Sequence, residues 1–123
     1  MSQSKIYNNI TTQELIELQK STKPTDKIIV KFSAVWCAPC KKINPLFEEF
    51  KKDLCDNHYL VVIDIEESID IYMTLKRYKM VNGIPAILVY NGGEREHWYL
   101  SDYSVLGGDE NRVKELFTLL KTN

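Results

Sequence analysis

Residues 36–40 read Trp-Cys-Ala-Pro-Cys, so Cys37 and Cys40 stand three positions apart. Cysteines at this spacing bind a metal ion, close a structural disulfide, or exchange electrons with a disulfide of another protein. The chain has 3 cysteines in 123 residues, too few for a disulfide framework, which indicates a reducing compartment. In such a compartment a close pair is more often catalytic or metal-binding than structural.

A zinc site is one competing interpretation, because Cys55 and His58 complete the spacing Cys-x2-Cys-x14-Cys-x2-His. The helix expected between these residues argues against it. A helix over residues 40–55 would separate Cys40 from Cys55 by about 22 Å at 1.5 Å per residue. We therefore expect no metal site, interpret Cys55 as a partly buried residue near a helix end, and assign no role to His58 or to the other histidine, His97.

The elements around the cysteine pair are a buried strand and an amphipathic helix. Residues 28–32 are β-branched and apolar on both faces apart from Lys31, which predicts a strand covered on both sides. From Pro39 onward the apolar residues recur at intervals of three and four, and Pro45 should kink the resulting helix. The apolar positions are Ile43, Leu46, Phe47, Phe50 and Leu54.

This arrangement would place Cys37 where the strand ends and the helix begins. Unpaired backbone N–H groups and the positive end of the helix dipole then favour its thiolate, the attacking species in disulfide exchange. Cys40 lies one turn deeper, close enough to attack a mixed disulfide at Cys37. The pattern predicts Cys37 as the nucleophile and Cys40 as the resolving thiol, with Lys41 and Lys42 adding positive charge nearby.

The remaining sequence predicts alternating helices and strands in a mixed α/β sheet with helices on both faces. Thr11-Thr12-Gln13-Glu14 has the pattern of a capping box before a first helix. We expect helices at residues 12–20, 69–78 and about 110–120, and strands at 60–65, 84–90 and, after an Asn91-Gly92-Gly93 turn, 95–99. No repeat or linker divides the chain, so residues 1–123 are expected to form one domain.

Composition excludes several classes of partner. The 16 basic and 17 acidic side chains give a formal net charge of -1, which provides no field to attract nucleic acid or an anionic membrane. The N-terminus lacks a signal-peptide core, and no apolar run is long enough to span a bilayer. We expect a soluble, cytoplasmic monomer.

Several motifs together resemble the thioredoxin family. Residues 32–41, FSAVWCAPCK, resemble its active-site segment, which usually has Gly where this chain has Ala38. Pro45 matches the family's kinking proline, Gly83-Ile84-Pro85 its cis-proline loop, and Asn91-Gly92 its hairpin turn. The resemblance implies a thioredoxin fold, with a central five-stranded mixed sheet flanked by four helices and a short first strand near residues 5–8.

The resemblance also implies a function, that of a protein-disulfide oxidoreductase and most simply a disulfide reductase without a cofactor. Its substrates would be protein disulfides, and a thioredoxin reductase or another thiol donor would supply electrons. A substrate groove would be formed by Trp36, Ala38, Pro39, Ile84, Pro85 and Gly107, with Gly108 as the alternative to Gly107. The aromatic stretch HWYLSDYSVL at residues 97–106 looks longer than usual for the family, and we expect it near this groove.

One position departs from the family pattern. Lys31 stands where the family usually has a buried aspartate, and Val62 stands where a lysine often pairs with that aspartate. A buried lysine is costly unless it is paired or deprotonated, and Asp64 is the partner we consider. We hypothesise that Lys31 tunes the redox pair by favouring the Cys40 thiolate; the alternative is that its side chain reaches the surface.

Two other functions remain open from the sequence. The first is a redox-inactive or narrowly targeted binding module that keeps the fold. The loss of the buried aspartate and the long loop leave it open, whereas the two cysteines, Trp36 and Pro85 favour the reductase. The second is a disulfide oxidase or isomerase. The Ala-Pro pair between the cysteines is close to the Gly-Pro of reducing relatives and unlike the His-containing pairs of oxidising relatives.

Overall fold

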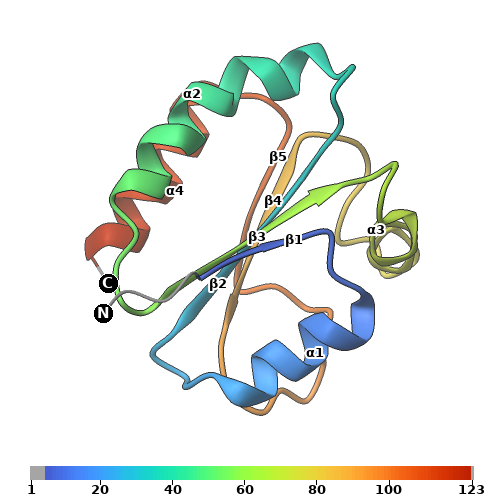
Figure 1. Ribbon diagram of the computed structural model, residues 1–123, viewed down its shortest axis with the longest axis vertical. Coiled ribbons are helices and arrows are strands. Elements are labelled where there is room, and N and C mark those ends of the chain that lie inside the picture. The colour runs from blue at the N-terminus through green and yellow to red at the C-terminus, as the bar shows by residue number, and fades with distance from the viewer. Residues whose placement is uncertain (1–4, 123) are drawn as a thin grey trace.

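The structure is a computed structural model that describes residues 5–122, in which a five-stranded sheet lies between helices (Figure 1). Along the chain the strands are β1 (Ile6–Asn8), β2 (Lys27–Ser33), β3 (His58–Asp64), β4 (Ala86–Asn91) and β5 (Tyr103–Leu106). Their order across the sheet is β1-β3-β2-β4-β5, with β1, β3 and β2 parallel and β4 and β5 antiparallel to their neighbours. The predicted mixed sheet and the short first strand are confirmed.

Two helices cover each face of the sheet in the described part of the chain (Figure 1). The helices are α1 (Thr12–Ser21), α2 (Ala38–Lys52), α3 (Ile69–Arg77) and α4 (Glu110–Thr122). Side chains of β2 alternate between the two layers: Ile28 and Val30 pack with α1 and α3, whereas Ile29 packs with α2 and α4. This explains why β2 is apolar on both faces, since it is the middle strand of a sheet that is covered on both sides.

The start of α1 follows its sequence signature. Thr11 Oγ1 accepts a hydrogen bond from the Glu14 N–H at 3.1 Å, and the Glu14 carboxylate accepts one from the Thr11 N–H at 2.8 Å. These reciprocal bonds satisfy two N–H groups that the first helical turn leaves without partners. The predicted capping box is therefore confirmed.

The predicted strand at residues 95–99 is wrong, because the chain does not turn back at Asn91-Gly92. Gly92 is buried against Thr22, whose side chain occupies the space that a Cβ would need, and the Gly93 N–H donates to the Gln19 carbonyl at 2.7 Å. These contacts draw the chain to the end of α1. A loop over residues 92–102 follows, and the last strand begins only at Tyr103.

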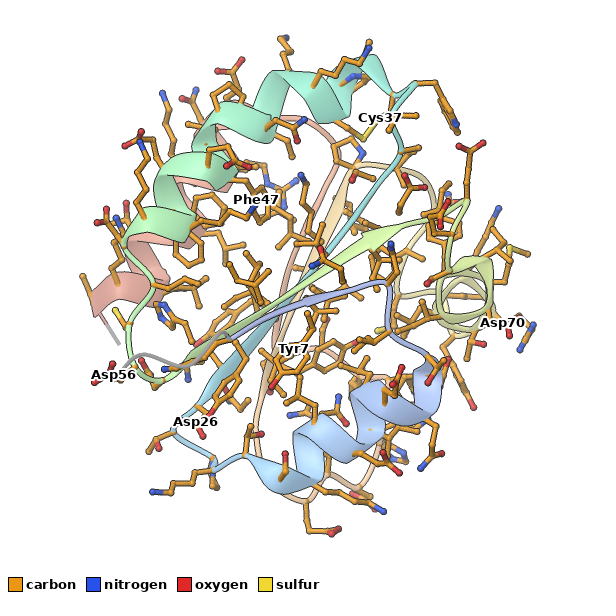
Figure 2. All side chains as sticks on the ribbon, in the orientation of Figure 1. Tyr7, Asp26, Cys37, Phe47, Asp56 and Asp70 are labelled. Atoms are coloured by element: carbon orange, nitrogen blue, oxygen red, sulfur yellow. A yellow bond between two sulfur atoms is a disulfide. The ribbon has the colours of Figure 1, made fainter. Side chains whose placement is uncertain are left out.

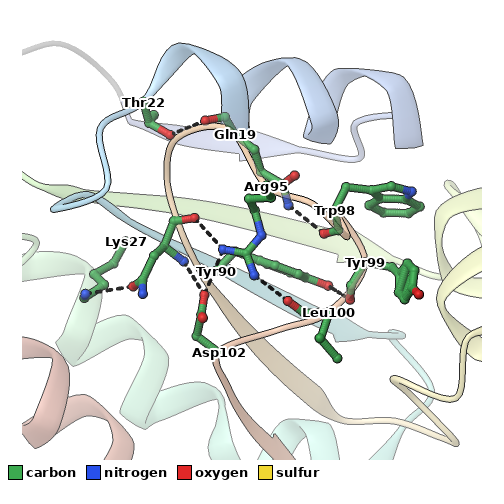
Figure 3. Close-up of polar contacts among 10 residues, drawn as sticks. Gln19, Thr22, Lys27, Tyr90, Arg95, Trp98, Tyr99, Leu100 and Asp102 are labelled. Carbon is green, nitrogen blue, oxygen red and sulfur yellow. Dashed lines mark hydrogen bonds and ion pairs between the residues drawn. The ribbon is translucent and has the colours of Figure 1, made fainter.

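Arg95 organises this loop (Figure 3). Its guanidinium donates to the carbonyls of Asn91 and Leu100, pairs with the Asp102 carboxylate at 2.9 Å, and lies 5.4 Å from the centre of the Tyr90 ring. Contacts of the Arg95 side chain thus hold residues 95–102 in a loop that lacks a strand ladder.

The loop lies at the end of the sheet opposite the cysteine pair. Asn91, where the loop begins, is paired with Lys27 at the start of β2, whereas Cys37 follows the end of β2. The expectation that the aromatic stretch flanks the groove is therefore wrong for residues 97–102. Only β5 runs back toward the cysteines, because Leu106 pairs with Ala86, directly after the cis-proline loop.

Candidate active site

Cys37 is the N-cap residue of α2, at the junction that the sequence predicts (Figure 2). Its Sγ accepts a hydrogen bond from the Cys40 N–H at 3.2 Å. The two cysteines form a disulfide with their Cα atoms 5.2 Å apart, and their exposed fractions are 4% and 1%. Cys37 therefore lies at the positive end of the helix dipole, among N–H groups that stabilise a thiolate.

An exposed apolar rim surrounds these buried sulfur atoms. Trp36 is 60% exposed and Val35 72% exposed, and both Ala38 and Pro39 are also exposed. Val35 was not predicted to be a site residue, because nothing in the sequence separates it from an ordinary core valine. Large apolar side chains at this level of exposure are available to contact another protein.

The Ile84–Pro85 peptide bond is cis, as the resemblance implies. Ile84 is half-buried and packs against a small cluster that contains Ala34 and both cysteines. The structure therefore brings residues 84–85 to the cysteine pair across a long separation in sequence.

The two adjacent glycines before α4 have different roles in the geometry. Gly107 has φ +99°, and its N–H donates to the Pro85 carbonyl at 2.9 Å. Gly108 lies against the first turn of α2, where an added Cβ would be 3.1 Å from Pro39 Cβ and 3.3 Å from the Pro39 carbonyl oxygen. Both glycines thus border the cysteine pair. Gly107 contacts the cis-proline loop, and Gly108 contacts Pro39, which stands between the two cysteines in the sequence.

Lys31 is 8% exposed and points toward α2. Its ammonium donates to Asn44 Oδ1 at 2.7 Å and lies 4.6 Å from the centre of the Phe47 ring. Burial lowers the pKa of Lys31, the nearby Lys51 lowers it further, and Glu48 opposes this shift. Most of the Lys31 side chain is therefore covered by α2.

Asp64 is not the partner of Lys31, contrary to the sequence interpretation. Its carboxylate accepts a hydrogen bond from the Glu66 N–H at 2.9 Å, within the turn after β3. Val62 is in register with Lys31 on the neighbouring strand and contributes no charge. The role of Asn44 was missed, because one amide on a helix does not reveal which strand residue it will contact.

The ring nitrogens of His58 are both occupied by backbone groups. Nδ1 accepts from the Cys55 N–H at 3.1 Å, and Nε2 lies 3.1 Å from the Leu120 carbonyl oxygen. Within residues 5–122 no group of three or more His, Cys, Asp or Glu side chains is placed to hold a metal ion. Cys55 is a partly exposed free thiol in the turn after α2.

None of the helices described over residues 5–122 has the length and apolar character needed to cross a membrane.

A cysteine pair that opens a helix beside a cis-proline, in a mixed sheet with helices on both faces, defines a class of thiol–disulfide exchange proteins. Comparison with known families gives the same answer, since the family model described as Thioredoxin matches residues 9–105. The chain belongs to the thioredoxin family of thiol–disulfide oxidoreductases, and it carries a disulfide between Cys37 and Cys40.

Individual relatives agree with this assignment. The chain is 25% identical to rice Thioredoxin H2-1, over 96% of its own length and 76% of that protein. It is 30% identical to Thioredoxin 3 of Plasmodium falciparum, over 79% of its length but only 49% of that protein, so it spans about half of this relative. The solved structure of Malassezia sympodialis thioredoxin matches 97% of the chain with a TM-score of 0.70 and 18% identity, which shows the shared fold.

Proposed function

We propose that this chain reduces disulfides of other proteins. The observation that carries the proposal is the position of Cys37, whose Sγ accepts an N–H bond at the start of α2 while Cys40 lies buried one turn deeper. This geometry favours a thiolate at Cys37 and keeps Cys40 protected until a mixed disulfide forms.

The reaction transfers two electrons from the dithiol to the substrate. The Cys37 thiolate attacks one sulfur of the substrate disulfide, which forms a mixed disulfide and releases the other substrate sulfur as a thiolate. Cys40 then loses its proton and attacks Cys37 Sγ. The Cys37–Cys40 disulfide forms, and the second substrate sulfur leaves as a thiolate that takes up a proton.

The substrate is proposed to bind as an extended segment along the apolar rim. Trp36, Ala38 and Pro39 would line one side, and the backbone of Ile84, next to Pro85, would pair with the segment. Gly107 leaves open space where any larger residue would place a side chain. Recognition through backbone bonds and apolar contacts suits many protein substrates.

The direction of electron flow is proposed from the two residues between the cysteines. Ala38-Pro39 differs from the Gly-Pro pair of reducing relatives by one methyl group. A thioredoxin reductase or another thiol donor would regenerate the dithiol, and the 3 cysteines of the chain suit the cytoplasm as a reducing compartment.

Lys31 is proposed to tune this pair. Its ammonium is bonded to Asn44, which follows Cys40 by one helical turn, about 6 Å along the axis of α2. The ammonium is mostly covered and lies beside the Phe47 ring, where a charge acts over a longer range than in water. A positive charge at Asn44 favours the Cys40 thiolate electrostatically. The aspartate usual in the family would instead accept the proton of the Cys40 thiol.

Reduction of insulin disulfides with dithiothreitol as electron donor tests the proposed function. We expect catalysis by the wild type and by Cys55→Ser, loss of catalysis in Cys37→Ser, and accumulation of a mixed disulfide in Cys40→Ser. A wild-type protein without activity above the dithiothreitol background would exclude the reductase and favour a redox-inactive binding module.

A further inference from the structure

His58 is a completely buried polar side chain that the redox reaction does not use. It begins β3, and its ring stacks on Phe50 of α2 with the ring centres 5.5 Å apart. One ring nitrogen contacts the Cys55 N–H in the turn after α2, and the other contacts the Leu120 carbonyl near the end of α4. One imidazole therefore joins a strand, a turn and the C-terminal helix.

The two backbone partners determine which nitrogen of His58 carries the proton. The Cys55 N–H can only donate, so Nδ1 must be unprotonated, and the Leu120 carbonyl can only accept, so Nε2 must carry the hydrogen. The neutral ring satisfies both contacts. A protonated ring would direct a second N–H at the Cys55 N–H and lose that hydrogen bond.

The charges that face this ring also disfavour its protonation. Lys5 precedes β1 and bonds to the carbonyls of the turn after α2, Lys27 begins β2, and Lys121 lies at the end of α4. The Asp53 carboxylate is paired with Lys121 at 3.0 Å. Burial is the main cause that lowers the pKa of His58, and the three lysines lower it further against the opposing bond to Leu120.

We propose that His58 is an acid-sensitive clasp, which holds the last turn of α4 and the turn at residues 53–57 against β3 and releases both when its ring is protonated. Figure 2 shows Asp56, in this turn, at the end of α2 opposite Cys37. The clasp therefore acts on the C-terminal helix at a distance from the redox pair.

The direction of the pH effect follows from the two states of the ring. A released histidine has its ordinary pKa of 6.5, and the clasped ring has a lower pKa. The stabilising effect of the clasp is therefore complete above pH 6.5 and is lost as the pH falls from 6.5 toward the pKa of the clasped ring. If only the released ring takes up a proton, the equilibrium constant for opening rises by up to about 30-fold between pH 7.5 and pH 5.

Amide hydrogen exchange in the oxidised, full-length protein tests the clasp at pH 7.5 and pH 5, after correction for intrinsic exchange rates. In the wild type we expect protection of the last turn of α4 and of the Cys55 amide to fall by about 10- to 30-fold at the lower pH.

Two variants without a titratable side chain at position 58 are the matched controls: His58→Asn keeps an acceptor for the Cys55 N–H, and His58→Gln keeps a donor for the Leu120 carbonyl. Protection in both should be nearly independent of pH. Equal wild-type protection at both values, or the same loss in both variants, would overturn the proposal.

A measurement on the wild type alone keeps the proposal testable if the variants fail to fold. Nitrogen-15 spectra of the His58 ring should show the neutral Nε2–H form at pH 6.5. A His58 ring that is protonated at pH 6.5, or that carries its proton on Nδ1, would contradict the clasp.

Discussion

Lys31 is the residue that most distinguishes this active site, because it places a cation beneath the helix that carries the cysteines. Removal of the charge in Lys31→Met should destabilise the cysteine thiolates and hence the reduced form of the pair. We expect the reduction potential to become more negative by about 10–30 mV, where 30 mV is a tenfold change in the equilibrium constant. Equilibration with glutathione buffers measures the change.

The matched control is Lys52→Met, which removes an exposed lysine from the far end of the same helix and should leave the potential unchanged. Lys31→Asp provides a second readout, because an acid at this position should alter the pH dependence of disulfide reduction. If Lys31→Met and Lys31→Asp both behave as the wild type does, Lys31 has no influence on the redox pair.

Gly108 is a second residue with a testable role, since its missing side chain allows the loop before α4 to lie against Pro39. Gly108→Val should crowd the first turn of α2, lower the free energy of unfolding by about 1–3 kcal/mol, and reduce kcat/KM for insulin reduction. Urea titration and the insulin assay measure the two effects. Asn111→Val, at an exposed position of α4, is the control, and equal behaviour of the two variants would contradict a specific contact at Gly108.

At the level of elements, periodic patterns predicted most helices and strands within one or two residues. β2 and α2 were recognisable because a buried strand and an amphipathic helix carry different apolar spacings. The last strand was placed wrongly because Asn91-Gly92-Gly93 has the pattern of a hairpin turn, whereas the contacts of Gly92 and Gly93 with the end of α1 are long-range and leave no local signal.

The loop at residues 92–102 should depend on Arg95 for its stability. Arg95→Met removes the donors to the Asn91 and Leu100 carbonyls and the cation paired with Asp102, whose carboxylate keeps only the Asn91 N–H as a donor. We expect the free energy of unfolding in urea to fall by about 2 kcal/mol. Arg112→Met, at an exposed position on α4, should change it by less than about 0.5 kcal/mol. A loss in Arg95→Met no larger than in this control would show that the loop does not depend on these contacts.

At the level of the whole molecule, the sheet separates two regions. The redox pair follows one end of β2, and the Arg95 loop lies beyond the other end. Substitutions in the loop should therefore change stability without changing the redox potential, whereas changes at Lys31 should change the redox potential. This separation also explains why Trp98 and Tyr99, which looked relevant to substrate binding in the sequence, contact Gln19 of α1 and Tyr78 at the end of α3 instead.

The site was predictable from the sequence to the extent that its parts are local. Cys37 and Cys40 could be identified as candidate redox residues from their spacing, from the strand before them and from the helix after them. The resemblance added the cis peptide bond at Pro85. The partners of Lys31 and His58 were not predictable, because each contact joins elements that only the folded sheet brings together.

The reduction potential of the Cys37–Cys40 pair at pH 7 tests the central claim most directly, because it sets the direction of electron flow. Thioredoxin has a potential of about -270 mV, and the strong oxidant DsbA one of about -120 mV. A reductase with a cation that favours the thiolates should have a potential at or slightly above the thioredoxin value, and more negative than about -200 mV. A potential near -120 mV, or a pair that does not exchange with glutathione, would contradict the account.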